Sequence, residues 1–171
     1  GYSDANAVSD GQIILDLGRM NKILEVNEKL GYITLEPGVT QGQVYDYLQK
    51  NNINLWMDAT GAGPDTSIIG NTMERGFGHS PYGDRYAHSC GYEVVLPSGE
   101  VLNTGFGHYS NSKVTEVYKW GVGPSIDGLF TQSNLGIVTK MTLWLMPKPE
   151  AFKVVIFMLK NEGDIAEFIE R

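Results

Sequence analysis

A loop rich in glycine and aromatic residues carries the most chemistry in this sequence. It spans residues 75–84, contains three glycines and ends in the carboxylate of Asp84. Glycine lets a ligand approach the backbone, and aromatic side chains suit contact with a flat ring, so the loop could bind a ring beside one ionisable group. Asp84 could equally cap the turn that starts near Tyr86, and the loop alone leaves both roles open.

Two further segments favour binding through the main chain. Residues 36–40 join a predicted strand to a capped helix, and residues 67–71 open a short helix. Helix N-termini offer N–H groups to anionic ligands, and glycine allows close approach. Each segment taken singly could also be an ordinary turn. Together they favour a ligand held by backbone groups without identifying it.

Other common chemistries find little support. The G-x-G pairs all lack the third glycine of a dinucleotide fingerprint, and there is no Walker-type lysine and no G-x-S-x-G elbow. The histidines are His79, His88 and His108, and only His88 lies near Cys90, in a spacing that matches no zinc motif. We therefore expect no metal site.

The composition is that of an ordinary globular domain. The chain has 171 residues, of which 42% are apolar and 19% charged, and its formal net charge is −7. An acidic balance disfavours nucleic-acid binding, and no apolar run reaches the ~20 residues of a membrane span. The single cysteine indicates a reducing compartment, so we expect the cytoplasm, with the periplasm as the alternative.

Hydrophobic patterning predicts a mixture of helices and antiparallel strands. Thr40 and Gln43 have capping-box spacing before a helix that runs to Asn51, and a turn at residues 97–99 separates the strands of a hairpin. The fold class expected is therefore α+β with an antiparallel sheet. The predicted strands cover residues 12–17, 32–36, 53–57, 92–96, 100–104, 137–146 and 154–159, and further helices cover 67–75 and 162–169.

Several motifs resemble one family of flavoenzymes. The run at residues 123–140, closing with Leu145-Met146-Pro147, resembles the vanillyl-alcohol oxidase and 4-cresol dehydrogenase family. The resemblance extends in order over nearly the whole chain. It includes Leu15-Asp16-Leu17-Gly18-Arg19-Met20-Asn21-Lys22, Glu36-Pro37-Gly38-Val39, Glu74-Arg75-Gly76, Pro81-Tyr82-Gly83-Asp84, Glu93-Val94-Val95-Leu96 and Ser98-Gly99-Glu100.

The resemblance implies a PCMH-like FAD-binding domain, in which two α+β subdomains hold an extended FAD between them. This chain resembles mainly the larger subdomain. Asp84 is implied as the catalytic residue, near the reactive N5 edge of the flavin. The residues implied to line the FAD are Pro37, Gly38, Val39, Ser67, Gly70, Asn71, Tyr82, Gly83, Asp84, Gly136, Ile137 and Val138.

The chain also departs from the family pattern. Residues 1–3 resemble the end of the glycine-rich pyrophosphate loop, so most of that loop and its subdomain are expected to be missing. His79 stands where the family often has an aromatic residue. We expect an FAD-binding domain over residues 1–149 and the start of a substrate domain over 150–171, because two prolines at 147 and 149 interrupt the last strand. Such a fragment is expected to be inactive alone.

The favoured function is hydride transfer from a 4-substituted phenol or related alcohol to flavin N5. One alternative keeps the fold but oxidises a 2-hydroxy acid or a sugar, and another is a nucleotide-binding module without turnover. The expected partners are a small-molecule substrate bound mainly by the missing domain, a cytochrome or oxygen as electron acceptor, and a second copy in a homo-oligomer.

Overall fold

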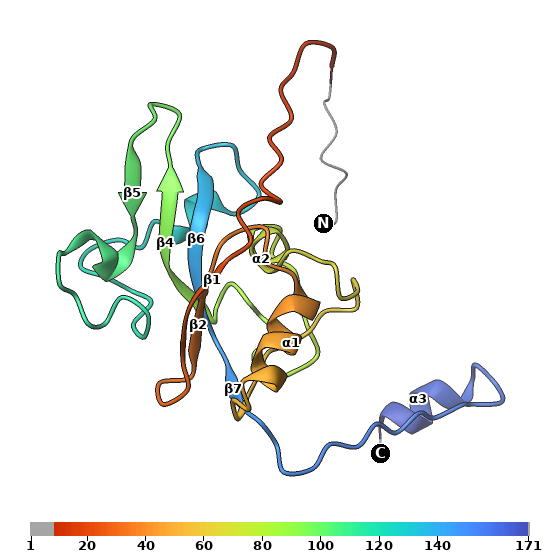
Figure 1. Cartoon of the computed structure of the whole chain (residues 1–171). Helices are drawn as coiled ribbons and strands as arrows, with labels where there is room; N and C mark the ends of the chain where they lie inside the picture. The colour runs from red at the N-terminus through yellow and green to blue at the C-terminus, as the bar shows by residue number, and fades with distance from the viewer. Residues whose placement is uncertain (1–8, 171) are drawn as a thin grey trace.

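The computed structural model describes residues 9–170 and is built on one five-stranded antiparallel sheet (Figure 1). The expectation about residues 1–3 lies outside the described residues. The strand order in the sheet is β1-β2-β6-β4-β5. The strands are β1 Ile23–Asn27, β2 Tyr32–Leu35, β4 Ser89–Val95, β5 Val101–Asn103 and β6 Ile137–Trp144. The expected α+β class is confirmed.

Strand β6 forms the centre of the sheet. It pairs with β2 along one side, where Leu35 faces Met141, and with β4 along the other, where Val94 faces Val138. All four residues of β2 are buried, which is the pattern of an inner strand rather than an edge. A strand that comes late in the chain therefore joins the two halves of the sheet.

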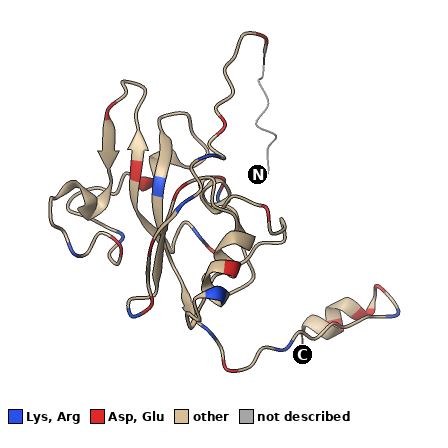
Figure 2. Ribbon diagram, viewed as in Figure 1, with Lys and Arg blue, Asp and Glu red and all other residues tan. Residues whose placement is uncertain are grey.

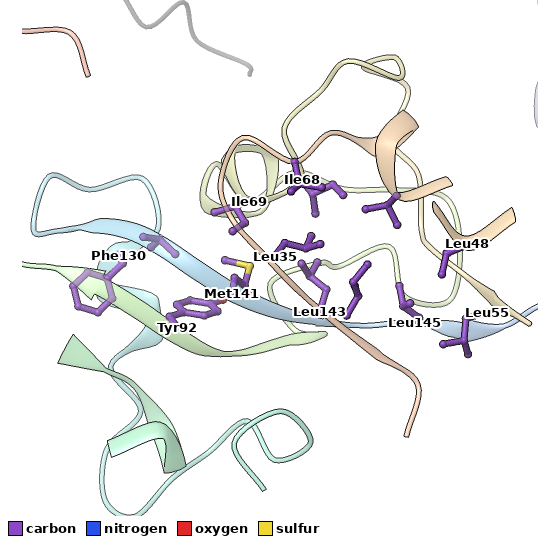
Figure 3. Packing of buried hydrophobic residues seen from close by; sticks show 14 of the residues in the cluster. Leu35, Leu48, Leu55, Ile68, Ile69, Tyr92, Phe130, Met141, Leu143 and Leu145 are labelled. Carbon is purple, nitrogen blue, oxygen red and sulfur yellow. The ribbon is translucent and has the colours of Figure 1, made fainter. Parts of the chain in front are cut away.

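Two helices cover one side of this sheet. Helix α1 spans Gln41–Lys50 and helix α2 spans Ile68–Met73. Figure 3 shows the resulting core, in which Ile68 and Ile69 of α2 lie near Leu35 of the sheet, and Leu48 of α1 lies at the other end near Leu55 and Leu145. Burial of these large apolar side chains is the main source of stability, at about 1.5–3 kcal/mol for each.

The predicted cap of α1 is confirmed in part. Thr40 Oγ1 accepts a hydrogen bond from the backbone N–H of Gln43 at 3.2 Å. The Gln43 amide does not return to Thr40, however. Its Nε2 instead donates to the carbonyl oxygen of Asn21 at 2.8 Å and ties the helix start to the segment before β1. The N-cap is therefore present without the reciprocal half of the capping box.

The remaining elements are short. Strand β3, Leu55–Trp56, pairs with β7, Met146–Pro147, in a second small sheet. The 3₁₀ turns η1, Gly105–His108, and η2, Asp127–Phe130, lie between β5 and β6, and helix α3, Asp164–Ile169, ends the described chain. The single strand predicted over 137–146 is thus divided at Leu145, whose N–H donates to Gly31 O.

Two predicted strands are absent from the structure, and strand β1 was not predicted. Residues 12–17 and 154–159 form no strand, and apart from half-buried Leu17 their apolar side chains are exposed, with Ile13 at 93% and Ile156 at 82%. Apolar β-type composition does not make a strand without a hydrogen-bonded neighbour, and in the described part of the chain neither segment has one. The β4–β5 hairpin, with Val95 facing Val101, and the helices at 41–50, 68–73 and 164–169 are confirmed.

The C-terminal segment lies apart from the sheet (Figure 1). Residues 150–170 are exposed throughout. Phe152 makes a ring contact back to the body, with its ring centre 5.0 Å from that of Trp56 in an edge-on arrangement. The domain boundary after residue 149 stays a prediction.

Candidate functional site

The glycine-rich loop closes on itself at residues 77–84. Phe77 and Asp84 form an antiparallel bridge at its base, the N–H of Gly78 donates to Gly83 O at 2.9 Å, and the N–H of Gly83 donates to Ser80 O at 2.9 Å. A side chain on Gly83 would lie 2.4 Å from Gly78 O, so this turn requires glycine. The loop therefore has a defined backbone shape before any ligand is added.

Asp84 performs a capping role and also leaves an oxygen exposed. Its Oδ1 accepts a hydrogen bond from the N–H of Ala87 at 3.0 Å, and its carbonyl accepts one from the N–H of His88. The residue is exposed, and its Oδ2 has no hydrogen-bond partner among residues 9–170. The turn-capping role is therefore present, and the same side chain still offers an acceptor to a ligand.

The structure brings two of the predicted binding segments together. Ser67 caps α2 through its Oγ, which accepts from the N–H of Gly70 at 2.9 Å, and the same Oγ donates to Pro37 O at 2.6 Å. The N–H of Ile68 also donates to Val39 O at 3.1 Å. Pro37, Gly38 and Val39 therefore lie directly against the start of the helix that carries Gly70 and Asn71.

The far end of α2 contacts the segment that leads into β6. Arg75 Nε donates to Thr131 Oγ1 at 3.1 Å, and the N–H of Gln132 donates to Met73 O at 2.9 Å. Gly136, Ile137 and Val138 follow shortly after. A side chain on Gly136 would meet Val94 Cγ1 at 2.5 Å, so packing inside the domain already explains that glycine.

A stack of rings supports the loop from the side of the sheet. The Tyr82 ring lies parallel to His88, with ring centres 4.3 Å apart, and His88 packs edge-on against Trp144 of β6 at 6.2 Å. Such ring pairs contribute about 0.5–1.5 kcal/mol beyond their buried area. Tyr82 is thereby occupied in fixing the loop, and its half-buried ring has one face against His88.

Lys119 links the irregular segment after β5 to the turn after Asp84. Its Nζ donates to the carbonyl oxygens of Tyr86 at 2.5 Å and Ser89 at 2.7 Å. Burial lowers the pKa of Lys119 and raises the pKa of the nearby Asp127 carboxyl, and the attraction between the two charges opposes both shifts. This lysine anchors the backbone that follows the loop.

Sequence reasoning missed the buried charged pair beneath the loop. Asp58 and Arg85 are 5% and 1% exposed, and Arg85 Nε lies 3.5 Å from Asp58 Oδ2. Asp58 also accepts hydrogen bonds from Ser80 within the loop. The only sequence signal is that each residue stands next to a glycine-containing loop, and that signal does not separate a buried charge from an exposed one.

An apolar groove runs beside the tip of the loop. It has a volume of about 620 Å³, and its lining includes Trp56, Met57, Pro81, Tyr82, Met146 and Phe152. Apolar and aromatic walls of this kind suit a flat or hydrocarbon group. The groove also holds His79, which is exposed there.

The described residues contain no group of three or more His, Cys, Asp or Glu side chains placed to hold a metal ion. Within residues 9–170, none of the helices is both long and apolar enough to span a bilayer. In Figure 2 the basic residues are spread singly among acidic ones along the ribbon.

Residues 1–105 match the family model described as an FAD binding domain. The chain belongs to this FAD-binding domain family. The cofactor expectation is thereby confirmed, and the mixed helical and antiparallel fold agrees with it.

Known proteins resemble this FAD-binding domain over nearly its whole length. It is 46% identical over 170 residues to the flavoprotein subunit of 4-cresol dehydrogenase [hydroxylating] from Pseudomonas putida, covering 99% of this chain and 33% of that protein. It is 49% identical over 162 residues to 1'-carboxy-chondrochloren decarboxylase from Chondromyces crocatus, covering 95% of this chain and 30% of that protein. The chain thus spans about a third of the length of these relatives.

A solved structure confirms the fold. The crystal structure of p-cresol methylhydroxylase with substrate bound matches with a TM-score of 0.86 and 46% identity, over 94% of this chain and 31% of that one. The resemblance to the 4-cresol dehydrogenase family and the PCMH-like fold are both confirmed. Neither comparison tests which residues contact the cofactor, so the residue list stays a prediction.

The residues present fit part of an FAD. The residues predicted to line the FAD include no lysine or arginine, so their side chains suit the ring system better than the phosphates. Exposed apolar side chains stand in and near them, with Phe77 at 63%, Leu135 at 50% and Ile137 at 38% exposure. Beside Phe77, which pairs with Asp84 in an antiparallel bridge, Asp84 Oδ2 supplies an acceptor without a partner among the described residues. Flat apolar surface with a polar edge is what a flavin requires.

Proposed function

We propose that the whole protein containing this chain oxidises a 4-substituted phenol or a related alcohol with FAD as the acceptor. The observation that carries the proposal is the 46% identity, over 99% of this chain, to the flavoprotein subunit of 4-cresol dehydrogenase. The likeness to p-cresol methylhydroxylase supports the same substrate class. Bound FAD would supply the hydride acceptor, at N5 of its ring.

Asp84 has a defined part in this proposal. Its Oδ1 is held by the N–H of Ala87, which fixes the carboxylate on the loop, and its Oδ2 remains available to accept a hydrogen bond. A carboxylate placed beside the flavin edge would accept a hydrogen bond from the reduced flavin and so favour the reduced form. The loop backbone and the cap at Ser67 would hold the ring in place, so these residues orient the cofactor while Asp84 adjusts its reactivity.

The remaining predicted residues would line the cofactor. Pro37, Gly38 and Val39 lie against Ser67 at the start of α2, so one ligand could contact both segments. The following group, Asn71, Tyr82, Gly83, Gly136, Ile137 and Val138, would extend the contact surface along α2, the loop and the start of β6. In the same proposal residues 1–149 form the cofactor domain, and residues 150–171 begin the domain that binds most of the substrate.

The proposal extends to an electron acceptor. The relative from Pseudomonas putida is named as a flavoprotein subunit, which makes it one component of an assembly. We propose that the whole protein passes its electrons to a cytochrome or to oxygen, and that it forms a homo-oligomer. For its location we propose the cytoplasm, with the periplasm as the alternative.

Anaerobic reduction of the whole protein tests the substrate class. The purified protein is mixed with 4-cresol, with D-lactate and with a sugar in separate reactions, and the absorbance band of oxidised flavin is followed with time. The proposal predicts loss of this band with 4-cresol alone.

The outcomes separate the alternatives. Loss of the flavin band with D-lactate or a sugar, and not with 4-cresol, would overturn the phenol proposal while keeping the flavoenzyme. Protein that is colourless as purified and stays colourless after incubation with FAD would favour a binding module without turnover.

A further inference from the structure

A buried arginine crosslinks the elements around the loop. Arg85 Nη2 donates to Gln41 Oε1 of α1 at 2.5 Å and to the carbonyl oxygen of Asp58 at 2.7 Å. Its Nη1 donates to Asn71 Oδ1 of α2 at 3.2 Å. Gln41 continues the network, because its Oε1 also accepts from the N–H of Thr60 at 2.9 Å. One planar guanidinium therefore joins both helices to the segment after β3.

Asp58 binds the loop of residues 77–84 and also lies beside this arginine. Its Oδ1 accepts hydrogen bonds from the Ser80 hydroxyl at 2.5 Å and from the Ser80 N–H at 3.1 Å. The loop backbone also lies directly on the carboxylate, since a side chain on Gly78 would come within 1.8 Å of Asp58 Oδ2. The position of the loop is therefore set by the Asp58 carboxylate, which lies in turn beside Arg85 at 3.5 Å.

The chain order connects this pair to Asp84. Arg85 follows Asp84 directly in the chain. Arg85 is buried, whereas Asp84 is exposed. Fixing the Arg85 side chain inside the domain therefore fixes the direction in which the Asp84 side chain leaves it. Ser80 supports the same loop at its tip, because its Oγ accepts from the N–H of Tyr82 at 3.1 Å.

Stability alone is a weak reason for such a pair. Taking two charges out of water costs several kcal/mol per ion, and apolar residues of similar size often replace a buried pair without loss of stability. What the pair provides is a fixed geometry, since the guanidinium fork and the carboxylate each bind several partners in set directions.

We propose that Asp58 and Arg85 are positioning residues that hold the loop of residues 77–84, and with it Asp84, in the arrangement needed at the flavin. The proposal rests on the proposed function for its effect on reduction, and on the contacts above for its effect on the loop. Neither residue contacts the flavin in this proposal. Their effect passes through the hydrogen bonds of Ser80 and through the backbone that joins Arg85 to Asp84.

The test compares variants of the whole FAD-loaded protein. Asp58→Asn removes the negative charge that lies beside Arg85 and accepts from Ser80, and Arg85→Lys keeps a positive charge but loses the fork. Ser80→Ala removes the two hydrogen bonds of the Ser80 hydroxyl, to Asp58 and from Tyr82, without burying an unpaired charge. Glu93→Gln is the matched control, because Glu93 forms a half-exposed ion pair with Lys140 at 3.3 Å on the sheet. Asp58→Asn and Arg85→Lys are expected to slow flavin reduction by about 10- to 100-fold, the cost of a small misplacement, and Ser80→Ala less.

A second readout does not depend on turnover. Hydrogen exchange of the amides of residues 77–84 is measured in each variant with FAD bound and after FAD removal, together with the visible circular dichroism of the bound flavin. We expect at least ten-fold faster exchange in this loop for Asp58→Asn and Arg85→Lys, with exchange in β6 unchanged, and an altered flavin spectrum. Ser80→Ala keeps the test decisive if the charged variants do not fold.

The results distinguish this inference from the proposed function. A parent protein whose flavin is not reduced by 4-cresol would overturn the substrate class, and the exchange and dichroism comparisons would still test positioning. Parental exchange rates and flavin spectra in folded Asp58→Asn, Arg85→Lys or Ser80→Ala would overturn the positioning role. An equal change in Glu93→Gln would also overturn it, because a general loss of stability would then account for the effect.

Discussion

At the scale of single residues, Asp84 shows how one side chain can serve both structure and chemistry. Oδ1 satisfies the N–H of Ala87, whereas Oδ2 has no partner among residues 9–170. The two roles that the sequence left open are therefore compatible, because they use different oxygens. This division makes the two roles separable by substitution.

We expect Asp84→Asn in the whole protein to retain FAD and to reduce it about ten-fold more slowly or worse. The asparagine oxygen can still accept from Ala87, so the turn is kept while the negative charge is lost. Asp84→Ala loses both and should in addition speed hydrogen exchange after residue 84. Anaerobic rapid mixing with the substrate measures the rates. Equal reduction rates in the parent and Asp84→Asn would remove the carboxylate from the chemistry.

The buried thiol of Cys90 should make the free energy of unfolding depend on pH. The residue is fully buried, and burial raises the pKa of its thiol to about 12 from the usual 9.0. At neutral pH the reactive thiolate is therefore about a thousand-fold rarer in the folded protein than in the unfolded chain. The folded state also keeps this proton between pH 9.0 and 12 while the unfolded state loses it, so its contribution to the free energy of unfolding should fall as pH rises through that window.

The protection of the Cys90 thiol is measured by its rate of alkylation with iodoacetamide, read by mass spectrometry of the peptide that contains Cys90. Labelling should be slow in native buffer and fast in denaturant. Rapid labelling of native protein at neutral pH would show that β4 opens readily, and the predicted protection would be wrong.

At the scale of elements, two predicted site glycines have different surroundings. A Cβ at Gly136 would lie 2.5 Å from Val94 Cγ1 on the neighbouring strand, whereas a Cβ at Gly70 would meet only the side chain of Ser67, at 3.1 Å. Gly136→Ala should therefore lower the free energy of unfolding by about 1–3 kcal/mol, the usual cost of overpacking, and Val94→Ala should restore part of it.

Gly70→Ala is the matched comparison, because alanine is favoured over glycine inside a helix. We expect its stability without FAD to stay near that of the parent. If Gly70 approaches the cofactor, FAD retention should weaken in this variant although its stability without FAD is that of the parent. Denaturant titration without FAD and flavin release on dilution measure the two effects. Parental stability in Gly136→Ala would contradict the packing argument.

The elements that could be predicted are those with local signals. Thr40 and Ser67 mark the starts of two helices, and the turn at residues 97–99 marks the hairpin, because caps and turns depend on neighbours a few residues away. Strand β1 could not be predicted from its mixed composition, since it is stabilised by pairing with β2. The errors at 12–17 and 154–159 have the same origin, because apolar composition does not reveal whether a partner strand is present.

The candidate site divides in the same way. Glycines and the exposed carboxylate of Asp84 could be found from motif resemblance, because such residues stand in continuous runs. The pair of Asp58 and Arg85 could not, since the residues are far apart in sequence and become neighbours only when β3, the loop and both helices are packed together.

At the scale of the whole molecule, the C-terminal segment should contribute little to the stability of the rest. Residues 150–170 are exposed, and the contact of Phe152 with Trp56 is the ring contact that joins them to the body. We expect the free energy of unfolding of a chain ending at residue 149 to lie within about 1 kcal/mol of that of the 171-residue chain. The shorter chain should also self-associate less, because the apolar side chains of 154–159 are removed.

Denaturant titration and sedimentation of the two chains measure both effects. A loss of several kcal/mol on truncation would place residues 150–171 within the same cooperative unit and contradict the boundary after residue 149.

The central place of β6 also bears on how the protein is made. Thr34 on β2 and Thr142 on β6 share a hydrogen bond at 2.8 Å across 108 positions of sequence. On the ribosome, β2 and β4 therefore leave the exit tunnel before β6, and the edges that pair with β6 stay exposed to solvent until that strand has been synthesised. Contacts so distant along the chain slow folding and leave open strand edges in the meantime, so the nascent chain should depend on chaperones until β6 emerges.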